Sequence, residues 1–188
     1  MIKMKKALIV YGTRYGATTG TAEEMSKVLS GEGFDVRVVD AKKEKIKDIS
    51  DYDLVIIGSG MRIFKWTSEP EKFIKKFQKV LRTKKTALFV SSGAQALHKH
   101  NGKTEDMEKA WNDYLVSKKE KYSLQPISMA IFGGIWDYNQ MGFPFKQTME
   151  PFKEELRNAG IQEVEPGVFD TRDWDEIRAW TFELAQKI

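Results

Sequence analysis

The chain has 188 residues, of which 41% are hydrophobic, enough for one sizeable core in a single domain over residues 1–188. It contains no cysteine, which excludes disulfides, thiolate metal sites, cysteine-ligated iron–sulfur clusters and a cysteine nucleophile. Its 31 basic and 27 acidic residues give a net charge of +4, a modest excess spread along predicted helices that argues against a nucleic-acid partner.

Charged residues interrupt every apolar run well before the roughly 20 residues that a membrane span needs. The lysines before Ala7 imitate the start of a signal peptide, but the apolar run 7–10 is too short and no small-residue cleavage site follows. We therefore expect a cytoplasmic protein without an integral membrane segment.

Residues 7–10 predict a strand that runs into a loop of glycines and threonines and then into a helix over residues 18–29. The first amides of that helix have no intrahelical partner. These donors, the helix dipole and the hydroxyls of Thr13 and Thr18 suit a phosphate dianion. The loop lacks the lysine of a P-loop and the glycine spacing of a dinucleotide fingerprint. An ordinary strand-turn-helix of an unrelated α/β protein is the alternative.

The pattern V-Y-x-T-x-x-G-x-T-x-x-x-A, which begins at Val10, resembles the FMN-phosphate loop of flavodoxins. The resemblance implies FMN as the cofactor and a phosphate held by six consecutive residues: Thr13, Arg14, Tyr15, Gly16, Ala17 and Thr18. Tyr15 stands where many flavodoxins have a small hydroxyl residue, so this chain lacks one side-chain contact of that kind.

Further strands are predicted over residues 34–39, 53–58, 87–91 and 127–132. The run 53–58 is almost wholly apolar, which is typical of a central parallel strand covered on both faces. Alternating strands and helices predict an α/β protein with a doubly wound, flavodoxin-like parallel sheet of five strands. We expect the order 2-1-3-4-5, with helices on both faces. Ligands of such sheets bind at the switch point between strands one and three, where the phosphate loop lies.

Helical patterns separate several of these strands. Ser68 and Glu71 have the spacing of a capping box, and apolar residues keep helical spacing from Phe73 to Leu81. Thr104 is the expected cap of another helix, whose buried stripe is Met107, Trp111, Tyr114 and Leu115.

The C-terminal part exceeds the five-strand plan. It predicts a helix near residues 145–158, a strand over 164–169 and a last helix that Asp173 caps. Two arrangements stay open: either residues 127–132 form the fifth strand and the tail carries an insertion, or residues 164–169 form the edge strand.

Two further loops at strand ends would hold the flavin ring, by the same resemblance. The loop after the third strand is expected to contact the ring through Ser59, Gly60, Met61 and Arg62. Phe64 or Trp66 either covers a face of the ring or packs against the next helix. The loop after the fourth strand suits the pyrimidine edge through its backbone, and its residues are Ser91, Ser92, Gly93, Ala94 and Gln95.

His98 and His100 are the two histidines of the chain, and they lack the cysteine or carboxylate partners of a metal site. We therefore expect no metal. No Ser-His-Asp elbow or paired catalytic acid stands out either, so the flavin is expected to carry the chemistry.

The segment from Gly133 to Pro144, with the Asp-Trp start of the last helix, resembles the flavodoxin-domain branch that includes menaquinone-dependent protoporphyrinogen dehydrogenase. We expect an FMN-binding electron-transfer flavoprotein with a redox protein or a small organic acceptor as partner. The alternatives are a dehydrogenase of protoporphyrinogen or quinone, and a binding module without redox activity. In the dehydrogenase, an aromatic lid over the substrate would consist of Trp136, Tyr138, Phe143 and Phe145.

Overall fold

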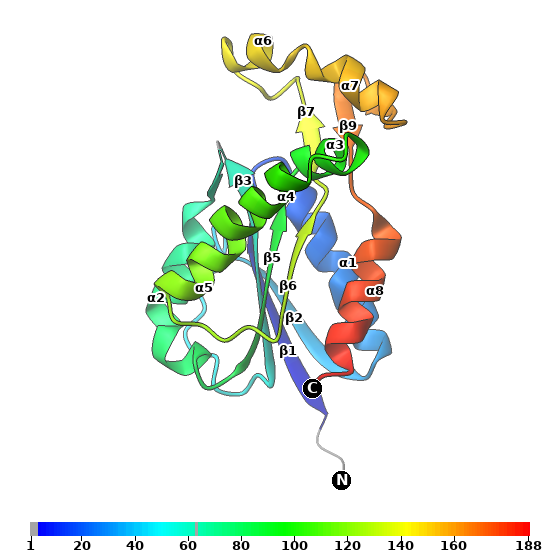
Figure 1. The fold of residues 1–188 in the computed structure, drawn as a ribbon. Coiled ribbons are helices and arrows are strands. Elements are labelled where there is room, and N and C mark those ends of the chain that lie inside the picture. Colours follow the sequence, from blue (N-terminus) through cyan, green and yellow to red (C-terminus); the bar gives the residue numbers. More distant parts are fainter. Residues whose placement is uncertain (1–3, 63) are drawn as a thin grey trace.

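A parallel sheet runs through the centre of the molecule (Figure 1). The computed structural model describes residues 4–62 and 64–188. The sheet order is β2-β1-β3-β5-β6, from the strands β1 (Lys5–Gly12), β2 (Phe34–Asp40), β3 (Leu54–Arg62), β5 (Lys85–Ser91) and β6 (Ser128–Phe132). A short strand, β4 (Lys65–Trp66), folds back antiparallel on the end of β3. The order confirms the predicted flavodoxin-like plan, and the run 127–132 supplies its fifth long strand.

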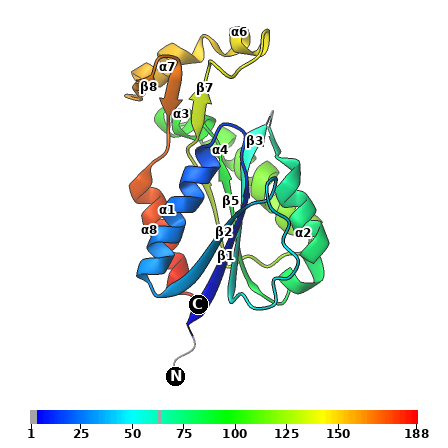
Figure 2. The ribbon, with the colours of Figure 1, turned by 180° about the vertical axis from the view of Figure 1, so that it is seen from behind.

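Helices cover both faces of the sheet (Figure 2). One apolar layer joins the sheet to α1 (Ala17–Gly31) and to α8 (Trp174–Ala185), through side chains such as Met25 and Ile177. The opposite layer joins it to α2 (Ser68–Leu81), α4 (Thr104–Trp111) and the π-helical turn η1 (Asn112–Val116). Tyr122 and Leu124, which follow the short helix α5 (Ser117–Lys121), belong to the same layer. The central strands are apolar in sequence because both of their faces are buried.

Two of the predicted helix caps are wrong. The Ser68 hydroxyl donates to Glu69 and not to the backbone, and Glu71 pairs with Lys118. Thr104 is the first helical residue, and no side chain caps its helix. Each helix begins at the residue expected to precede it, so the hydroxyl lies past the N-cap position from which it could accept an orphan amide.

The predicted stripe after Thr104 is only partly buried. Leu115 is fully buried, whereas Trp111 is 38% exposed. The π-helical turn η1 begins directly after Trp111. A π turn adds a residue to the helical repeat, so side chains on its two sides no longer follow one stripe.

The chain between β6 and α8 forms a separate lobe above the carboxyl ends of the sheet (Figure 1). We call residues 135–170 the insertion. Its antiparallel sheet has the order β7-β9-β8, from β7 (Ile135–Asp137), β8 (Glu163–Glu165) and β9 (Val168–Asp170), and its helices are α6 (Phe145–Met149) and α7 (Phe152–Asn158). The single helix predicted over 145–158 is therefore wrong: Pro151, which has no amide hydrogen, lies between α6 and α7. The strand predicted over 164–169 is also wrong, because the chain turns at Gly167, where φ is +78°.

The cap predicted for the last helix is confirmed. The Asp173 carboxylate accepts hydrogen bonds from the amides of Asp175 and Glu176, both at 3.0 Å. We expect Asp173→Ala to lower the free energy of unfolding by about 1 kcal/mol, because two orphan amides lose their acceptor. Urea titration measures the change. Asp175→Ala is the control, since its side chain is 95% exposed, and a loss as large as that of Asp173→Ala would contradict the assignment.

Among the described residues, every helix is too short or too polar to cross a bilayer.

Candidate functional site

The loop between β1 and α1 leaves the start of a long helix open. Gly16 adopts φ +85°, and its amide donates to the Thr13 hydroxyl at 3.0 Å, which fixes the turn. The first turn of α1 has no acidic residue and no side-chain cap. By contrast, α2, α4, α7 and α8 each carry two acidic residues in the first turn. The positive end of α1 is thus left without a negative group of its own, as an anion-binding terminus requires.

Thr18 adds a hydroxyl that lacks a partner. Its side chain is fully buried, and its Oγ1 makes no hydrogen bond in the part of the chain that the structure describes. A Cβ placed on Gly60 would lie 3.0 Å from this oxygen and 3.6 Å from the Arg14 amide nitrogen. The end of β3 therefore packs directly on the loop. A buried hydroxyl without a partner costs about 1–3 kcal/mol, so an anion that accepts its hydrogen bond would recover that cost.

A groove of about 380 Å³ lies beyond the strand ends. Each of the three predicted loops contributes to its wall, namely through Arg14 and Tyr15, Met61, and Gly93 with Ala94. The opposite wall comes from the insertion and is mostly apolar: Ile135, Trp136, Met141, Gly142, Phe143, Pro144, Phe145 and Met149. This volume lies within the range of small-molecule sites.

Several of the residues predicted to contact the ring are not among the described residues that line this groove. The buried Ser59 hydroxyl donates to the Gly60 carbonyl at 2.9 Å and accepts from the Thr67 amide at 3.0 Å, so it fixes the start of α2. Ser91 is buried, and the Ser92 amide donates to the Phe132 carbonyl. Gln95 lines a different cavity, of about 470 Å³, between α3 (Ala94–His100) and α4. The side chain of Arg62, and Ile63, lie outside the described residues.

The two aromatic residues proposed to cover the ring differ in environment. Trp66 is 7% exposed, and its indole nitrogen donates to the Tyr114 carbonyl at 2.9 Å. It therefore packs against the helical layer. Phe64 is 78% exposed and has φ +60°, a backbone conformation that is uncommon for a residue with a side chain.

The insertion places Trp136 over the second ring loop. A Cβ on Gly93 would lie 2.0 Å from the Trp136 indole nitrogen, so any larger residue there requires the indole ring to move. Tyr138 is not among the described residues that line the groove, and its side chain is fully buried. Its ring stacks on that of Trp136 with 6.3 Å between the ring centroids, and its hydroxyl donates to the Met149 carbonyl at 2.9 Å. Burial raises the pKa of Tyr138 to about 12, so its hydroxyl is neutral and donates. Phe143 lines the groove and is 82% exposed.

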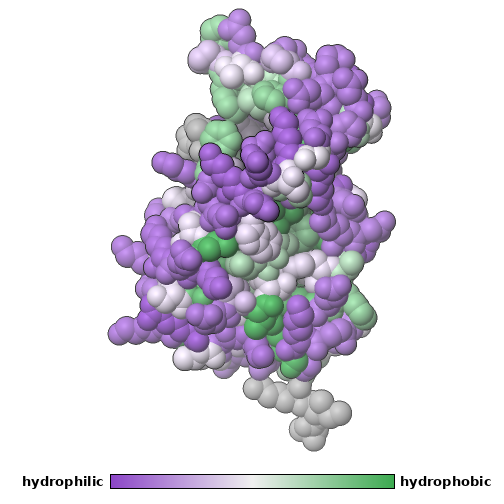
Figure 3. All heavy atoms as spheres, in the orientation of Figure 1, coloured by the Kyte–Doolittle hydropathy of each residue, from purple (hydrophilic) through white to green (hydrophobic). Residues whose placement is uncertain are grey.

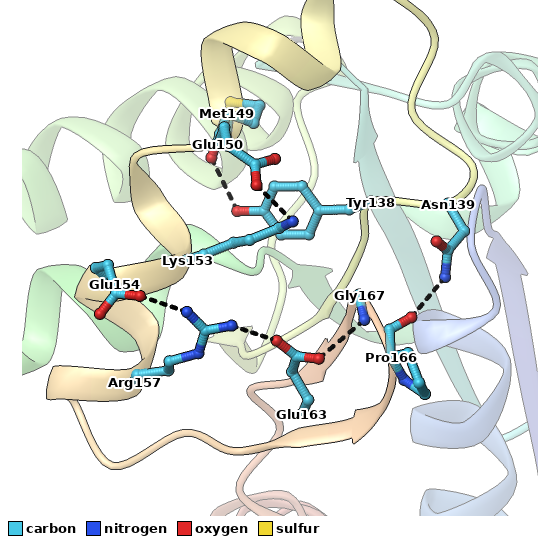
Figure 4. Close-up of polar contacts among 10 residues, drawn as sticks. All are labelled: Tyr138, Asn139, Met149, Glu150, Lys153, Glu154, Arg157, Glu163, Pro166 and Gly167. Carbon is cyan, nitrogen blue, oxygen red and sulfur yellow. Dashed lines mark hydrogen bonds and ion pairs between the residues drawn. The ribbon is translucent and has the colours of Figure 1, made fainter.

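Polar contacts brace the insertion on its outer side (Figure 4). Arg157 pairs with Glu154 and Glu163, and Glu163 also accepts from the Gly167 amide at 3.0 Å. The Asn139 side chain donates to the Pro166 carbonyl at 2.8 Å. Figure 3 shows apolar residues, in green, gathered on this lobe among hydrophilic ones. The insertion thus has a fixed shape and offers an apolar face to the groove.

Two contacts that sequence reasoning missed hold the insertion to the main sheet. The Thr171 hydroxyl accepts from the Gly134 amide at 2.9 Å and lies 3.4 Å from the Gly93 carbonyl. Arg172 pairs with Asp170 and donates to the Ala17 carbonyl at 3.1 Å. The second contact ties the end of the insertion to the first residue of α1, across 155 positions of sequence, and no local pattern predicts it.

The segment with the histidines forms the last turn of α3. Lys99 is paired with Glu176 at 2.7 Å, so its charge is balanced. Within residues 4–62 and 64–188, no group of three or more metal-ligating side chains comes together.

Comparisons with known proteins agree with this architecture. A family model described as a flavodoxin domain matches residues 8–159. A flavodoxin from the domain Archaea is 16% identical, with a TM-score of 0.55 over 97% of each chain. A flavodiiron core from Synechocystis sp. PCC6803 is 11% identical, with a TM-score of 0.57 over 99% of this chain and 36% of its own. A short-chain flavodoxin associated with a PDU bacterial microcompartment is 14% identical, with a TM-score of 0.50 over 82% of this chain and 98% of its own.

Proposed function

This chain belongs to the flavodoxin-domain family, and from that premise we propose that it binds FMN and passes electrons between a redox partner and an acceptor. The observation that carries the proposal is the open end of α1, beside the buried hydroxyl of Thr18, which has no hydrogen-bond partner in the described part of the chain. Both features suit the phosphate of FMN.

The groove supplies the rest of the site. Met61 would contact the ring on one side, and Gly93 with Ala94 would approach it through the backbone. The insertion closes the far wall and keeps water from part of the ring. Bound FMN supplies reversible one- and two-electron chemistry, and the protein sets its position and its reduction potential.

A redox cycle tests this function. The purified protein, saturated with FMN and freed of excess, is reduced by light in the presence of a sacrificial donor and then reoxidised by ferricyanide. We expect complete, reversible bleaching of the flavin absorbance with no loss of bound FMN. Protein that stays colourless after saturation and gel filtration would instead be the binding module without redox activity.

One prediction concerns the positive charge of Lys65, which lies on the same hairpin as Met61 of the groove. Lys65 is exposed, has no acidic partner among the described residues and begins β4, where it is the strand partner of Arg62, whereas Lys99 is paired with Glu176. A cation about 10 Å from a redox centre, at an effective dielectric of about 40, favours one added electron by about 0.8 kcal/mol, or roughly 35 mV. We expect Lys65→Glu to lower the reduction potential of bound FMN by several tens of mV at low salt. Spectroelectrochemistry measures it, and Lys187→Glu is the control; equal shifts in both variants would contradict the local effect.

A second candidate function is supported by the apolar wall of the insertion. Phe143 and Phe145 line the groove and remain 82% and 43% exposed, which suits a flat organic substrate beside the flavin. A dehydrogenase of the protoporphyrinogen or quinone type would use this wall. Steady-state turnover with protoporphyrinogen and menaquinone distinguishes it from a pure electron carrier.

A further inference from the structure

The positive charge of this protein is concentrated beside the proposed flavin site. A cleft of about 710 Å³ lies against Thr13 and Arg14 of the phosphate loop, and a second cleft of about 350 Å³ adjoins it, since both are lined by Lys42 and Glu69. The basic residues that line them are Arg14, Lys42, Lys45, Lys65, Lys72 and Lys76.

These charges are mostly uncompensated. Among the described residues that line the two clefts, only Glu44 and Glu69 are acidic, and Glu44 is already paired with Arg37. Among the described ion pairs, none includes Lys42, Lys45 or Lys72. The excess of four positive charges in the clefts equals the net charge of the whole chain, +4.

The hairpin of β3 and β4 lies between the larger cleft and the groove. Met61, at the end of β3, lines the groove, whereas its strand partner Trp66 lines the larger cleft. Arg14 lines both. A protein seated on the clefts would therefore contact the element whose other side forms the flavin site.

The tip of this hairpin adds an apolar contact. Phe64 is 78% exposed and held at φ +60°, so the turn presents an aromatic ring to solvent. The next residue, Lys65, lines the larger cleft, and exposed aromatic side chains beside charged residues are typical of protein interfaces.

We infer that the redox partner of this chain is a protein with an acidic surface, which docks over the two lysine-lined clefts and the Phe64 turn. The inference rests on the proposed function, because it assigns the surface through which electrons reach the FMN. Opposite charges guide such a partner to the site and orient it, and the attraction weakens as salt increases.

The test uses a reduced acidic plant-type ferredoxin as electron donor and stopped-flow absorbance as readout. One electron leaves the iron–sulfur cluster, which is oxidised, and enters the bound FMN, which is reduced. We expect the second-order rate to fall about tenfold between about 20 mM and about 300 mM NaCl. Transfer from the reduced protein to basic cytochrome c is the comparison, and its rate should stay constant or rise with salt.

Charge reversal locates the surface. The variant Lys42→Glu/Lys45→Glu/Lys72→Glu should react with ferredoxin about tenfold more slowly at low salt. The control Lys85→Glu/Lys109→Glu/Lys187→Glu makes the same change in net charge at exposed positions away from the clefts, and its rate should change less than twofold. Phe64→Asn, which suits a positive φ, should slow transfer without altering its salt dependence.

The outcomes separate the two proposals. Equal rates for both triple variants, or a ferredoxin rate independent of salt, would overturn the docking surface and leave FMN-based electron transfer intact. A chain that binds no FMN would overturn the proposed function. The docking surface would then be tested by calorimetric titration of the flavin-free protein with ferredoxin, where the cleft variant should lose binding and the control variant should keep it.

Discussion

Thr18→Val should weaken the binding of FMN by about 1–3 kcal/mol, roughly five- to 150-fold, and should make the FMN-free protein no less stable. Valine has the shape of threonine without the hydroxyl. This hydroxyl is buried and has no partner among the described residues, so without FMN its removal should cost nothing or increase the free energy of unfolding. With FMN bound, the same change removes a hydrogen bond to a charged phosphate. Fluorescence titration and urea unfolding measure the two effects.

Riboflavin and Thr19 supply the controls. Riboflavin lacks the phosphate, so Thr18→Val should leave its affinity almost unchanged. The neighbouring Thr19 is partly exposed, and Thr19→Val should change FMN affinity by less than twofold. An equal loss for FMN and riboflavin, or a Thr18→Val protein that is less stable and binds FMN normally, would remove Thr18 from the phosphate site.

Gly93→Ala should lower the free energy of unfolding by about 1–3 kcal/mol and weaken flavin binding at the same time. The backbone at Gly93 has φ −61° and ψ −29°, which alanine adopts without strain. The added methyl group would lie 2.0 Å from the Trp136 indole nitrogen, so the indole ring must move, and with it a wall of the groove. Thermal unfolding and FMN titration test this result.

Two further variants show whether Trp136 is the cause. Gly142 also lines the groove, but a Cβ there meets no atom of the described residues within 4 Å, so Gly142→Ala should leave stability unchanged. Trp136→Phe should relieve the clash, and the double variant should then be more stable than the sum of the single effects predicts. Additive losses of stability would show that Gly93→Ala does not destabilise the protein through its contact with Trp136.

The main sheet was predictable from sequence because its signals are local. Apolar runs define the strands, helical spacing defines most of the covering layers, and right-handed crossovers then leave few possible strand orders. The loop that we propose for the phosphate was predictable as a connection between strand and helix for the same reason, since its residues from Thr13 to Thr18 are contiguous.

The insertion was not predictable because distant contacts determine its position. Residues 164–169 read equally well as an edge strand of the main sheet. Arg172 reaches the Ala17 carbonyl, and Thr171 reaches the backbone of Gly134, so the insertion is held over the strand ends. The same reason applies to Ser59. Its position at the end of a strand does not reveal that its hydroxyl accepts from the Thr67 amide.

Titration of the FMN-free protein with FMN and with riboflavin, followed by flavin fluorescence, tests the central claim most directly. We expect FMN to bind one molecule per chain with quenched fluorescence, and riboflavin to bind at least tenfold more weakly, because the open end of α1 and the Thr18 hydroxyl act on the phosphate. Equal affinities for the two flavins, or no binding of either, would contradict the assignment of this site to FMN.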